Sequence, residues 1–195
     1  MKFRYPFLVL YITLAVQAGL AQNTYVPDDN FEQALIDLGY DDVLDDYVLT
    51  ANISGVTSLD VEAKEISDLT GIEDFTALTN LRCHDNELTS LDVSNNTALN
   101  SLFCYHNSID SLDVSSNTAL TAFHCGNNQL TSLDVSANTS LSSLTCWNNQ
   151  LTSLDVSNNT SLTSLRCNHN QLTILDVSNN TALTFLWINN NQFTY

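Results

Sequence analysis

Apolar residues recur along most of this chain with a fixed period of 21 residues. From position 99 one repeat reads Leu-x-x-Leu-x-Cys-x-x-Asn-x-Ile-x-x-Leu-Asp-Val-Ser-x-Asn-Thr, and its neighbours keep the same order. A constant period in the twenties is typical of stacked coils that share one continuous core. The pattern therefore predicts a solenoid, whose extended surface usually serves for binding.

Each repeat has two similar halves. The first half is Leu-x-x-Leu-x-Cys-x-x-Asn, and the second is Leu-x-x-Leu-Asp-Val-Ser-x-Asn-Thr. Both halves alternate apolar and polar positions, which is typical of a short strand with one face turned toward a core. We therefore expect a mostly β or α/β solenoid with one or two parallel strands per coil, equivalent residues lying about 4.8 Å apart.

The solenoid is predicted to occupy residues 53–195, in about seven coils. The first coil contains Leu59-Asp60-Val61, residues 66–72 diverge from the pattern, and five regular units then begin at Leu88, Ile109, Leu130, Leu151 and Leu172. The chain stops part-way into the next coil, so we expect no C-terminal cap. An uncapped strand edge can recruit another strand, and end-to-end self-association is a further expectation.

Residues 22–52 are not repetitive and predict an N-terminal cap. Asp29 and Glu32 have the spacing of a capping box, and the apolar residues that follow recur at helical spacing. This pattern predicts a short helix over residues 30–38 that ends at Gly39. Terminal repeats need a cover, so we expect this helix to close the open end of the first coil.

The first 21 residues have the features of a secretory signal peptide. Lys2 and Arg4 precede an apolar run over residues 7–16, and small residues lead to a predicted cleavage before Gln22. The run is short for a bilayer span, and no other segment could cross one. We therefore expect a secreted or cell-surface protein that is not inserted in the membrane after cleavage.

The charge of the chain is strongly negative. The 195 residues carry a formal charge of −17, and removal of residues 1–21 leaves 174 residues with three cations, 22 acidic residues and a charge of −19. Of the 22 acidic residues, 16 precede Leu88. Binding to phosphates needs clustered cations, so nucleic acid and acidic membrane surfaces are not expected partners.

The segment Leu78-x-x-Leu81-x-Cys83-x-x-Asn86-x-Leu88 resembles the core motif of leucine-rich repeat proteins, with cysteine at the third apolar position. The nested double half resembles the 21-residue bacterial subclass of that family. Residues 66–78 are similar to the repeats of internalin-type surface proteins. The resemblance covers about residues 53–193 and implies a curved solenoid whose variable strand face binds a partner, without catalytic activity.

Five cysteines form one column of the repeat: Cys83, Cys104, Cys125, Cys146 and Cys167. Secreted chains usually oxidise their cysteines, but stacked side chains would place the Cβ atoms about 4.8 Å apart. A disulfide prefers about 3.8 Å between its Cβ atoms. We therefore expect buried free thiols that act as small apolar groups.

Asparagines form two further columns. The first contains Asn86, Asn107, Asn128, Asn149, Asn170 and Asn191, and the second contains Asn96, Asn117, Asn138, Asn159 and Asn180. An amide side chain both donates and accepts, so a stacked column can bond to the turn backbone of neighbouring coils. We interpret both columns as structural, although sequences such as Asn95-Asn96-Thr97 also match a glycosylation sequon.

Aspartates form an outward column of Asp92, Asp113, Asp134, Asp155 and Asp176. Each carboxylate can accept hydrogen bonds from its own turn or from nearby hydroxyl groups. Calcium bridging is the alternative, because it would relieve the repulsion between stacked like charges. A second acidic cluster at residues 41–46 lacks the spacing of a calcium loop.

Variation between repeats concentrates beside the cysteine column, on the outward face of the predicted first strand. We call this set the aromatic strip, and its members are Arg82, His84, Phe103, Tyr105, His106, His124, Trp147, Arg166, His169 and Trp187. Exposed aromatic residues and arginine dominate protein interfaces, and aromatic rings also stack on sugars. The strip predicts a site for a protein or glycan partner, although its rings could merely support one another.

Other functions have weaker support. In Cys83–His84 and His124–Cys125, neighbouring strand residues face opposite sides, so a thiol nucleophile would not meet its base. No catalytic motif, cofactor motif or complete set of metal ligands is present. A repetitive surface of threonine and asparagine columns could bind polysaccharide, mineral or ice, but Asp110 interrupts the threonines Thr89, Thr131, Thr152 and Thr173. A purely structural surface-layer repeat is a further alternative.

Overall fold

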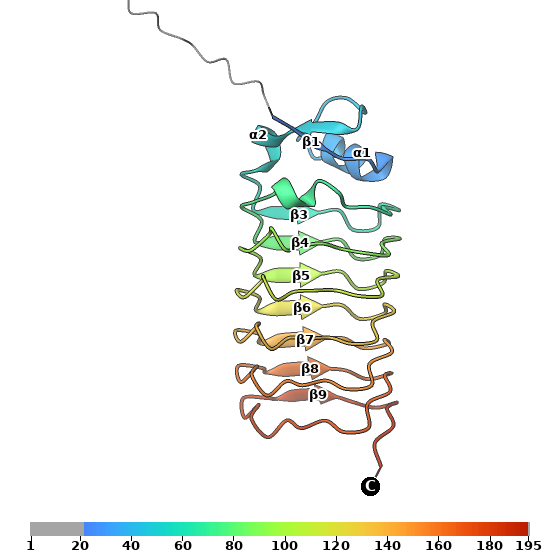
Figure 1. Cartoon of the computed structure of the whole chain (residues 1–195), viewed down its shortest axis with the longest axis vertical. Coiled ribbons are helices and arrows are strands. Elements are labelled where there is room, and N and C mark those ends of the chain that lie inside the picture. The colour runs from blue at the N-terminus through green and yellow to red at the C-terminus, as the bar shows by residue number, and fades with distance from the viewer. Residues whose placement is uncertain (1–21, 195) are drawn as a thin grey trace, which may run out of the picture.

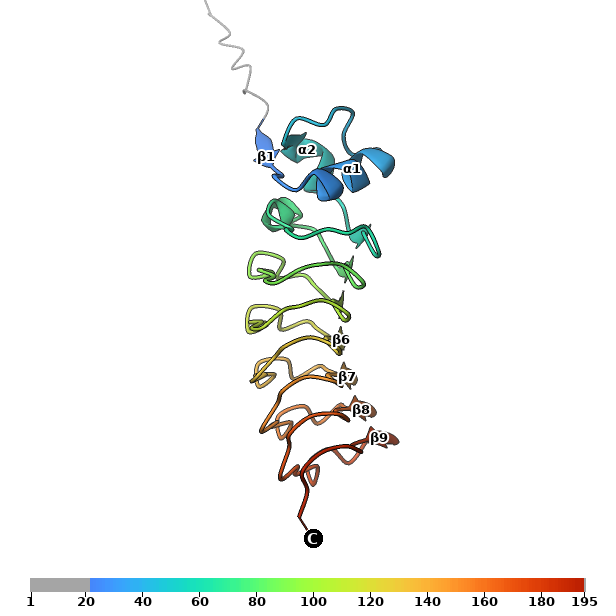
Figure 2. The same cartoon turned by 90° about the vertical axis from the view of Figure 1, so that its right-hand side faces the viewer.

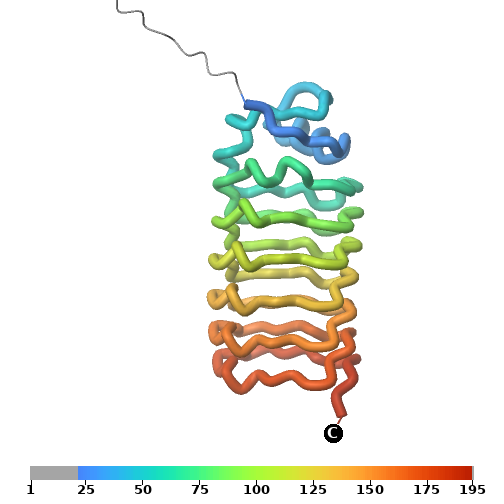
Figure 3. Tube along the Cα trace, in the orientation of Figure 1, coloured from blue at the N-terminus to red at the C-terminus, as the bar shows by residue number. Residues whose placement is uncertain are grey.

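A computed structural model describes residues 22–194 and shows a single stack of coils (Figures 1 and 3). The predicted signal peptide lies outside the described residues. Each coil contributes one three-residue strand to a parallel sheet. The strands are β3 (Ser58–Asp60), β4 (Asn80–Arg82), β5 (Ser101–Phe103), β6 (Ala122–His124), β7 (Ser143–Thr145), β8 (Ser164–Arg166) and β9 (Phe185–Trp187).

Successive strands pair in sequence order and in register. Leu81 of β4 lies beside Leu102 of β5, and each later strand keeps the same 21-residue offset. The β3–β4 pair has an offset of 22 residues, because the divergent first coil is one residue longer. The predicted columns therefore exist, and turning the molecule by 90° shows all the strands on one gently concave side (Figure 2).

Each coil has one strand, not two. The second half of the repeat is extended but forms no strand ladder in residues 22–194. Its backbone N–H groups instead close local turns, in which the amide of Asn117 donates to Val114 and that of Leu120 donates to Asn117. The alternation of apolar and polar residues placed the side chains correctly, but it could not show that these turns replace the ladder.

The inward side chains form one continuous core. In the coil that begins at Leu99, the side chains of Leu102, Cys104, Ile109 and Val114 are all fully buried. The last coil is less complete, since β9 pairs only with β8 among the described residues. Its Leu186 is 41% exposed, whereas every equivalent residue in the other coils is buried.

The asparagine columns join neighbouring coils, as predicted. The Nδ2 of Asn128 donates to the backbone carbonyls of Cys104 and Cys125, while its Oδ1 accepts from the amide of Ile109. In the second column, Nδ2 of Asn138 donates to the carbonyls of Val114 and Asn117. Both columns are turned into the stack, and they supply backbone groups with partners that a continuous ladder would otherwise provide.

All five cysteines are free and buried, as the sequence predicts. Burial disfavours the charged thiolate, which raises the pKa of every thiol. The pKa of Cys104 rises to about 12, and that of Cys167 to about 11. The thiols therefore remain neutral at physiological pH and pack as apolar groups.

The N-terminal region contains more secondary structure than the sequence predicts. It contains β1 (Asn23–Tyr25), α1 (Asp29–Asp37), β2 (Tyr47–Leu49) and α2 (Thr50–Ile53), and β1 pairs antiparallel with β2. A short 3-10 helix, η1 (Ile72–Asp74), follows within the divergent first coil. Only the first helix is predicted from the sequence, because three-residue strands carry too few positions for a clear pattern.

The predicted capping box of Asp29 and Glu32 does not form. Asp28, not Asp29, caps α1, with its Oδ1 accepting from the amides of Asn30 and Phe31. Glu32 is fully buried and instead accepts from the backbone amides of residues 45–47. A buried carboxylate needs several donors, and the loop before β2 supplies them. The chain leaves the helix at Gly39, as expected, with a left-handed φ of 80°.

Helix α1 packs on the first coil. The rings of Phe31 and Phe75 lie 6.4 Å apart and are both fully buried. The second carboxylate oxygen of Asp28 accepts from the backbone and hydroxyl of Ser67 and from the amide of Asp68. One residue therefore caps the helix and ties it to the coil beneath. No helix within residues 22–194 has the length and apolar character needed to span a membrane.

Candidate binding surface

The aromatic strip lies on the outward side of the seven-stranded sheet. Three repeat positions supply it: the last residue of each strand, the residue two places later, and the next residue, which forms a turn. Because the strands are in register, these positions become three parallel columns. The structure therefore brings the ten predicted residues to one side of the stack.

The turn column has a left-handed backbone. Its residues are Asp85, His106, Asn127, Asn148, His169 and Asn190, with φ between 50° and 56°. Outside glycine, asparagine, aspartate and histidine adopt this conformation most readily. The turn thus partly explains why histidine stands at positions 106 and 169. A role in binding is not needed to account for these two residues.

At the N-terminal end of the strip, the positive charge of Arg82 is paired with acidic side chains of the preceding coil. Arg82 forms ion pairs with Asp60 at 3.1 Å and with Glu62 at 2.6 Å. The hydrogen bond to Arg82 lowers the pKa of the Glu62 carboxyl group. His106 Nδ1 lies 2.7 Å from an oxygen of Asp85 in the same region. The Arg82 cation is therefore already paired, and acidic side chains outnumber it at this end of the strip.

The structure corrects the prediction that His84 is an exposed residue of the site. Its side chain is only 5% exposed, because Tyr105 stacks on it with ring centroids 4.2 Å apart and Glu62 lies 2.9 Å from its Nε2. The alternation of strand residues put the ring on the outward face correctly. A neighbouring coil then covers it, so His84 supports Tyr105 and offers little surface of its own.

Toward the C-terminal end the rings surround a shallow hollow of about 330 Å³. We call it the strip hollow, and its lining residues are Tyr105, His106, His124, Ser143, Thr145, Trp147, Ser164 and Arg166. Five of them are predicted site residues. Ser143, Thr145 and Ser164 are not, because small polar residues at these repeat positions look like scaffold in the sequence. Thr145 carries a signal, because it replaces large residues in its column, whereas Ser143 and Ser164 stand in a column of mostly small residues and carry none.

Ring contacts link the walls of the hollow. His106 meets Trp147 edge-to-face at 5.6 Å, and His124 meets Phe103 in the same way at 4.8 Å. The indole of Trp147 also lies over Gly126, where a Cβ atom would come within 3 Å of three indole atoms. Glycine at this position of the second column therefore makes the space that the tryptophan occupies.

The remaining strip residues lie beside the hollow. The guanidinium of Arg166 lies 4.9 Å from the ring centroid of Phe185 and 5.3 Å from that of Trp187. Trp187 is 49% exposed, and His169 is exposed as well. Trp187 thus adjoins the hollow through Arg166, whereas His169 is not part of its lining and contacts only Asn190 among the polar side chains described.

The geometry supports recognition more than catalysis. The thiols adjoining His84 and His124 are sealed in the core with raised pKa values. Burial and the nearby charge of Arg166 lower the pKa of His124. Within residues 22–194, no three histidine, cysteine or acidic side chains gather closely enough to hold a metal ion.

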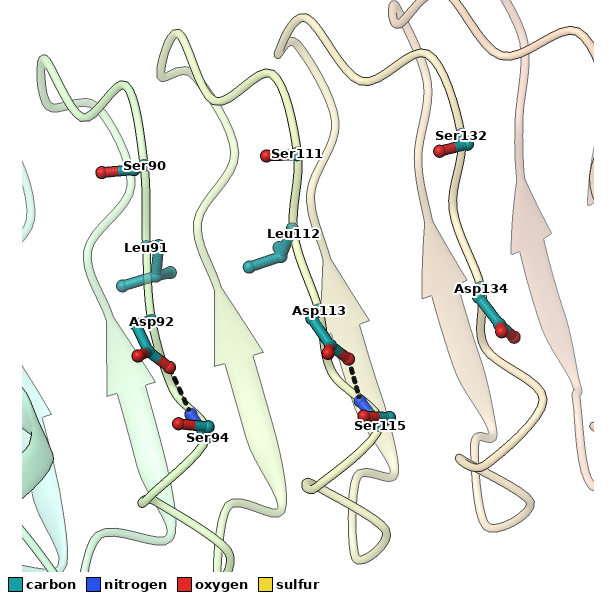
Figure 4. A pocket seen from close by; sticks show the side chains of 10 residues that line it. All are labelled: Ser90, Leu91, Asp92, Ser94, Ser111, Leu112, Asp113, Ser115, Ser132 and Asp134. Carbon is teal, nitrogen blue, oxygen red and sulfur yellow. Dashed lines mark hydrogen bonds between the residues drawn. The ribbon is translucent and has the colours of Figure 1, made fainter.

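A second, larger hollow of about 840 Å³ lies over the second half of the repeats (Figure 4). It is lined by the repeated serines and by Asp92, Asp113 and Asp134. Each of these aspartates accepts a hydrogen bond from the amide two residues later, as Asp113 does from Ser115 at 2.8 Å. Hydrogen bonds from the amide and hydroxyl of that serine lower the pKa of each carboxyl group, and for Asp134 the hydroxyl of Ser136 is the main cause. The column therefore has the structural role that its sequence predicts as one of two alternatives.

The structure weakens the alternative that a repetitive surface of threonines and asparagines binds a ligand, because the asparagines are mostly inaccessible. The second asparagine column is buried throughout, and in the first column three residues are buried and three are half-buried. Only the threonine positions remain exposed, and Asp110 interrupts them. A lattice-like ligand would therefore meet a broken row of single hydroxyl groups.

Comparison with known proteins agrees with this architecture. A family model described as the LVIVD repeat matches residues 83–107, 144–166 and 167–190, each segment close to one coil in length. Internalin J of Listeria monocytogenes is 41% identical over 87 residues, which are 44% of this chain and 9% of that protein.

Solved structures show the same fold. The functional domain of InlJ from Listeria monocytogenes, described as including a cysteine ladder, matches with 33% identity and a TM-score of 0.59 over 90% of this chain and 49% of that one. Internalin C2 of the same species matches at 20% identity with a TM-score of 0.65, covering 90% and 92% of the two chains. A leucine-rich repeat protein of Leptospira interrogans matches at 24% identity with a TM-score of 0.68, covering 74% and 40%.

The fold is that of a leucine-rich repeat solenoid. Its sequence is internalin-like, and the likeness to InlJ extends to the cysteine column described above. The chain spans about half the length of the solved InlJ domain and a small part of the whole Internalin J.

Proposed function

We propose that this protein is a non-catalytic binding module, and that the aromatic strip recognises a protein partner outside the cell. The observation that carries the proposal is the strip hollow. It gathers Tyr105, Trp147 and Arg166 on the concave side, whereas the cysteine, asparagine and aspartate columns are occupied by core packing or backbone hydrogen bonds. Tyrosine, tryptophan and arginine are the residues that most often anchor protein interfaces.

A protein fits this surface better than a glycan does. The rings are arranged edge-to-face and stand in register along the sheet, which gives a long, uneven surface and not one flat platform. Such a surface suits an extended partner that places side chains between the rings. The resemblance to internalins also favours partner binding through the variable strand face. A glycan partner is the competing outcome, and a glycan array tests it.

The proposal is tested with a double variant, Tyr105→Ala with Trp147→Ala. The wild-type protein and the variant are immobilised and used to capture extracellular proteins, which are compared by quantitative mass spectrometry. The matched control is Thr152→Ala with Thr173→Ala, which removes two exposed side chains from the other side of the coils. We expect partners to be lost by the strip variant and kept by the control. Equal capture by all three proteins, each folded by circular dichroism, contradicts the proposal.

An extracellular location is part of this proposal. It is supported by the charged and apolar start of residues 1–21 and by the internalin-like sequence. Expression of the full chain in a bacterial host tests it. We expect protein in the medium or at the cell surface with Gln22 as its first residue, and an intact start inside the cell argues against it.

A further inference from the structure

The cations of the folded chain are not equivalent. Residues 22–194 contain three lysines and arginines, and two of them are paired with acidic side chains. Lys64 Nζ lies 3.7 Å from Asp37, and Arg82 lies between Asp60 and Glu62. In the part of the chain that the structure describes, Arg166 has no carboxylate within 4.0 Å.

Aromatic rings hold Arg166 in place. Its guanidinium contacts Phe185 and Trp187 through cation–π geometry, at 4.9 and 5.3 Å from the ring centroids. These contacts position the group without neutralising it, and within residues 22–194 its guanidinium donates no hydrogen bond. The group is therefore an ordered and unpaired cation at the edge of the strip hollow.

The hollow itself has no acidic residue in its lining. It offers the hydroxyls of Ser143, Thr145 and Ser164, beside the rings of Tyr105 and Trp147. The whole chain has a formal charge of −17, but 16 of its 22 acidic residues precede Leu88, so the coils that form the hollow carry few of them. Hydroxyl donors together with one guanidinium suit an anionic oxygen group, and the rings suit an apolar neighbour of that group.

We infer that the strip hollow receives an acidic side chain of the protein partner. Its carboxylate pairs with Arg166 and accepts from hydroxyls of the hollow, while an adjacent apolar side chain packs against Trp147. This inference rests on the proposed function and adds the chemistry of the anchor. A carboxylate matches the planar guanidinium in a bidentate way, which gives direction as well as attraction.

The other wall of the hollow agrees with this assignment. His124 Nε2 lies 3.2 Å from the hydroxyl of Ser143, and the ring also contacts Phe103. Burial and the nearby charge of Arg166 lower the pKa of His124, which favours the neutral ring beside the permanent charge of Arg166. A carboxylate beside Arg166 would offset its charge and raise the pKa of His124, which NMR can follow.

The experiment is a selection of 12-residue peptides from a random display library on the wild-type protein. We expect the selected peptides to share one Asp or Glu beside an apolar residue. Synthetic versions of the best peptide are then made with the acid or with its amide. On the wild-type protein we expect the amide version to bind at least ten times more weakly.

The acid and amide peptides are next measured on Arg166→Gln. We expect the tenfold preference for the acid to disappear, because the partner of the carboxylate is gone. The control is Lys64→Gln, which removes the same charge from a cation outside the strip and should keep the preference. A preference that survives in Arg166→Gln, or selected peptides without a shared acid, overturns the inference.

The same peptides separate this inference from the proposed function. If Trp147→Ala abolishes binding while Arg166→Gln leaves the acid preference intact, the strip binds proteins but the acidic anchor is wrong. If neither change affects binding, or if the library yields no peptide for the strip, both the proposed protein binding by the strip and the acidic anchor are wrong. Melting curves of each variant show that the fold is retained.

Discussion

The indole of Trp147 fills the space beside Gly126 in which a Cβ atom would lie, and that Cβ would clash with Nε1 of the ring. The two residues are adjacent in one repeat column, 21 positions apart. The absence of a side chain in one coil therefore sets the position of the largest side chain in the next. This pairing defines one wall of the strip hollow.

The first prediction concerns this pair. Gly126→Ala should displace the indole toward solvent, since Trp147 is only partly buried and can move more easily than the backbone. We expect a red shift in tryptophan emission with a loss of stability of about 0.5–3 kcal/mol, the usual range for a substitution at a buried position such as Gly126. Gly55→Ala is the control, because a Cβ there has nothing within 4 Å. Unchanged emission in Gly126→Ala would show that the contact does not position Trp147.

The second prediction concerns the asparagine column. Asn128→Ala leaves two backbone carbonyls and the amide of Ile109 without their partners inside the stack. Each unsatisfied buried group costs about 1–3 kcal/mol, so for three groups we expect a loss of about 3–9 kcal/mol in urea unfolding. Asn191→Ala removes an equivalent set of bonds in the less buried last coil and should cost clearly less, because water can replace them. Equal losses would argue that burial does not set the contribution.

The third prediction concerns the cysteine column and alkaline pH. The folded thiols have raised pKa values, so above about pH 8.5 the unfolded chain loses thiol protons that the folded chain keeps. The free energy of unfolding should therefore fall as the pH rises from 8 toward 10. For Cys125→Ala we expect a fall that is smaller by about 2 kcal/mol, the share of one thiol.

Urea unfolding at both pH values measures this effect, and comparing the change within each variant removes the direct cost of the substitution. A native protein that also fails to react with a thiol reagent, but shows five reactive thiols once unfolded, agrees with the buried free column. The same pH dependence in Cys125→Ala and wild type would be evidence against it.

The fourth prediction concerns acid. The turn hydrogen bonds lower the pKa of Asp113, Asp134 and Asp155, with the amide or hydroxyl of the following serine as the main cause. Their stabilising effect is therefore present above the ordinary pKa of about 3.9 and is lost as the pH falls through the lower folded values. The triple Asp→Asn variant keeps an acceptor oxygen in each turn but does not titrate. We expect its melting temperature to fall less than that of wild type between about pH 5 and pH 2.

Calcium bridging is the alternative role of the same aspartate column, and a chelator tests it. Because the turns already supply partners to these carboxylates, we expect a chelator to leave the melting temperature of the wild-type protein unchanged. A drop on chelation that the triple Asp→Asn variant does not show would instead support a bridging ion.

Several details of the cap show why local patterns were insufficient. The spacing of Asp29 and Glu32 fits a capping box, yet Glu32 bonds to residues 45–47 and Asp28 caps the helix. A motif that spans four residues cannot reveal donors from a loop more than ten residues away. The small strands β1 and β2 were missed for the same reason, since their pairing depends on contacts across 20 or more residues.

The sequence by itself determined the stack: a strict 21-residue period and a two-residue alternation are enough to order the coils, orient the cysteines and asparagines inward, and collect the aromatic strip on one side. Tertiary structure alone decided what each strip residue can do. It covered His84 with Tyr105, neutralised Arg82 with Glu62 and left Arg166 without an acidic partner. The physical reason is that a period specifies which residues are neighbours, whereas charge pairing, ring stacking and burial depend on the distances between them.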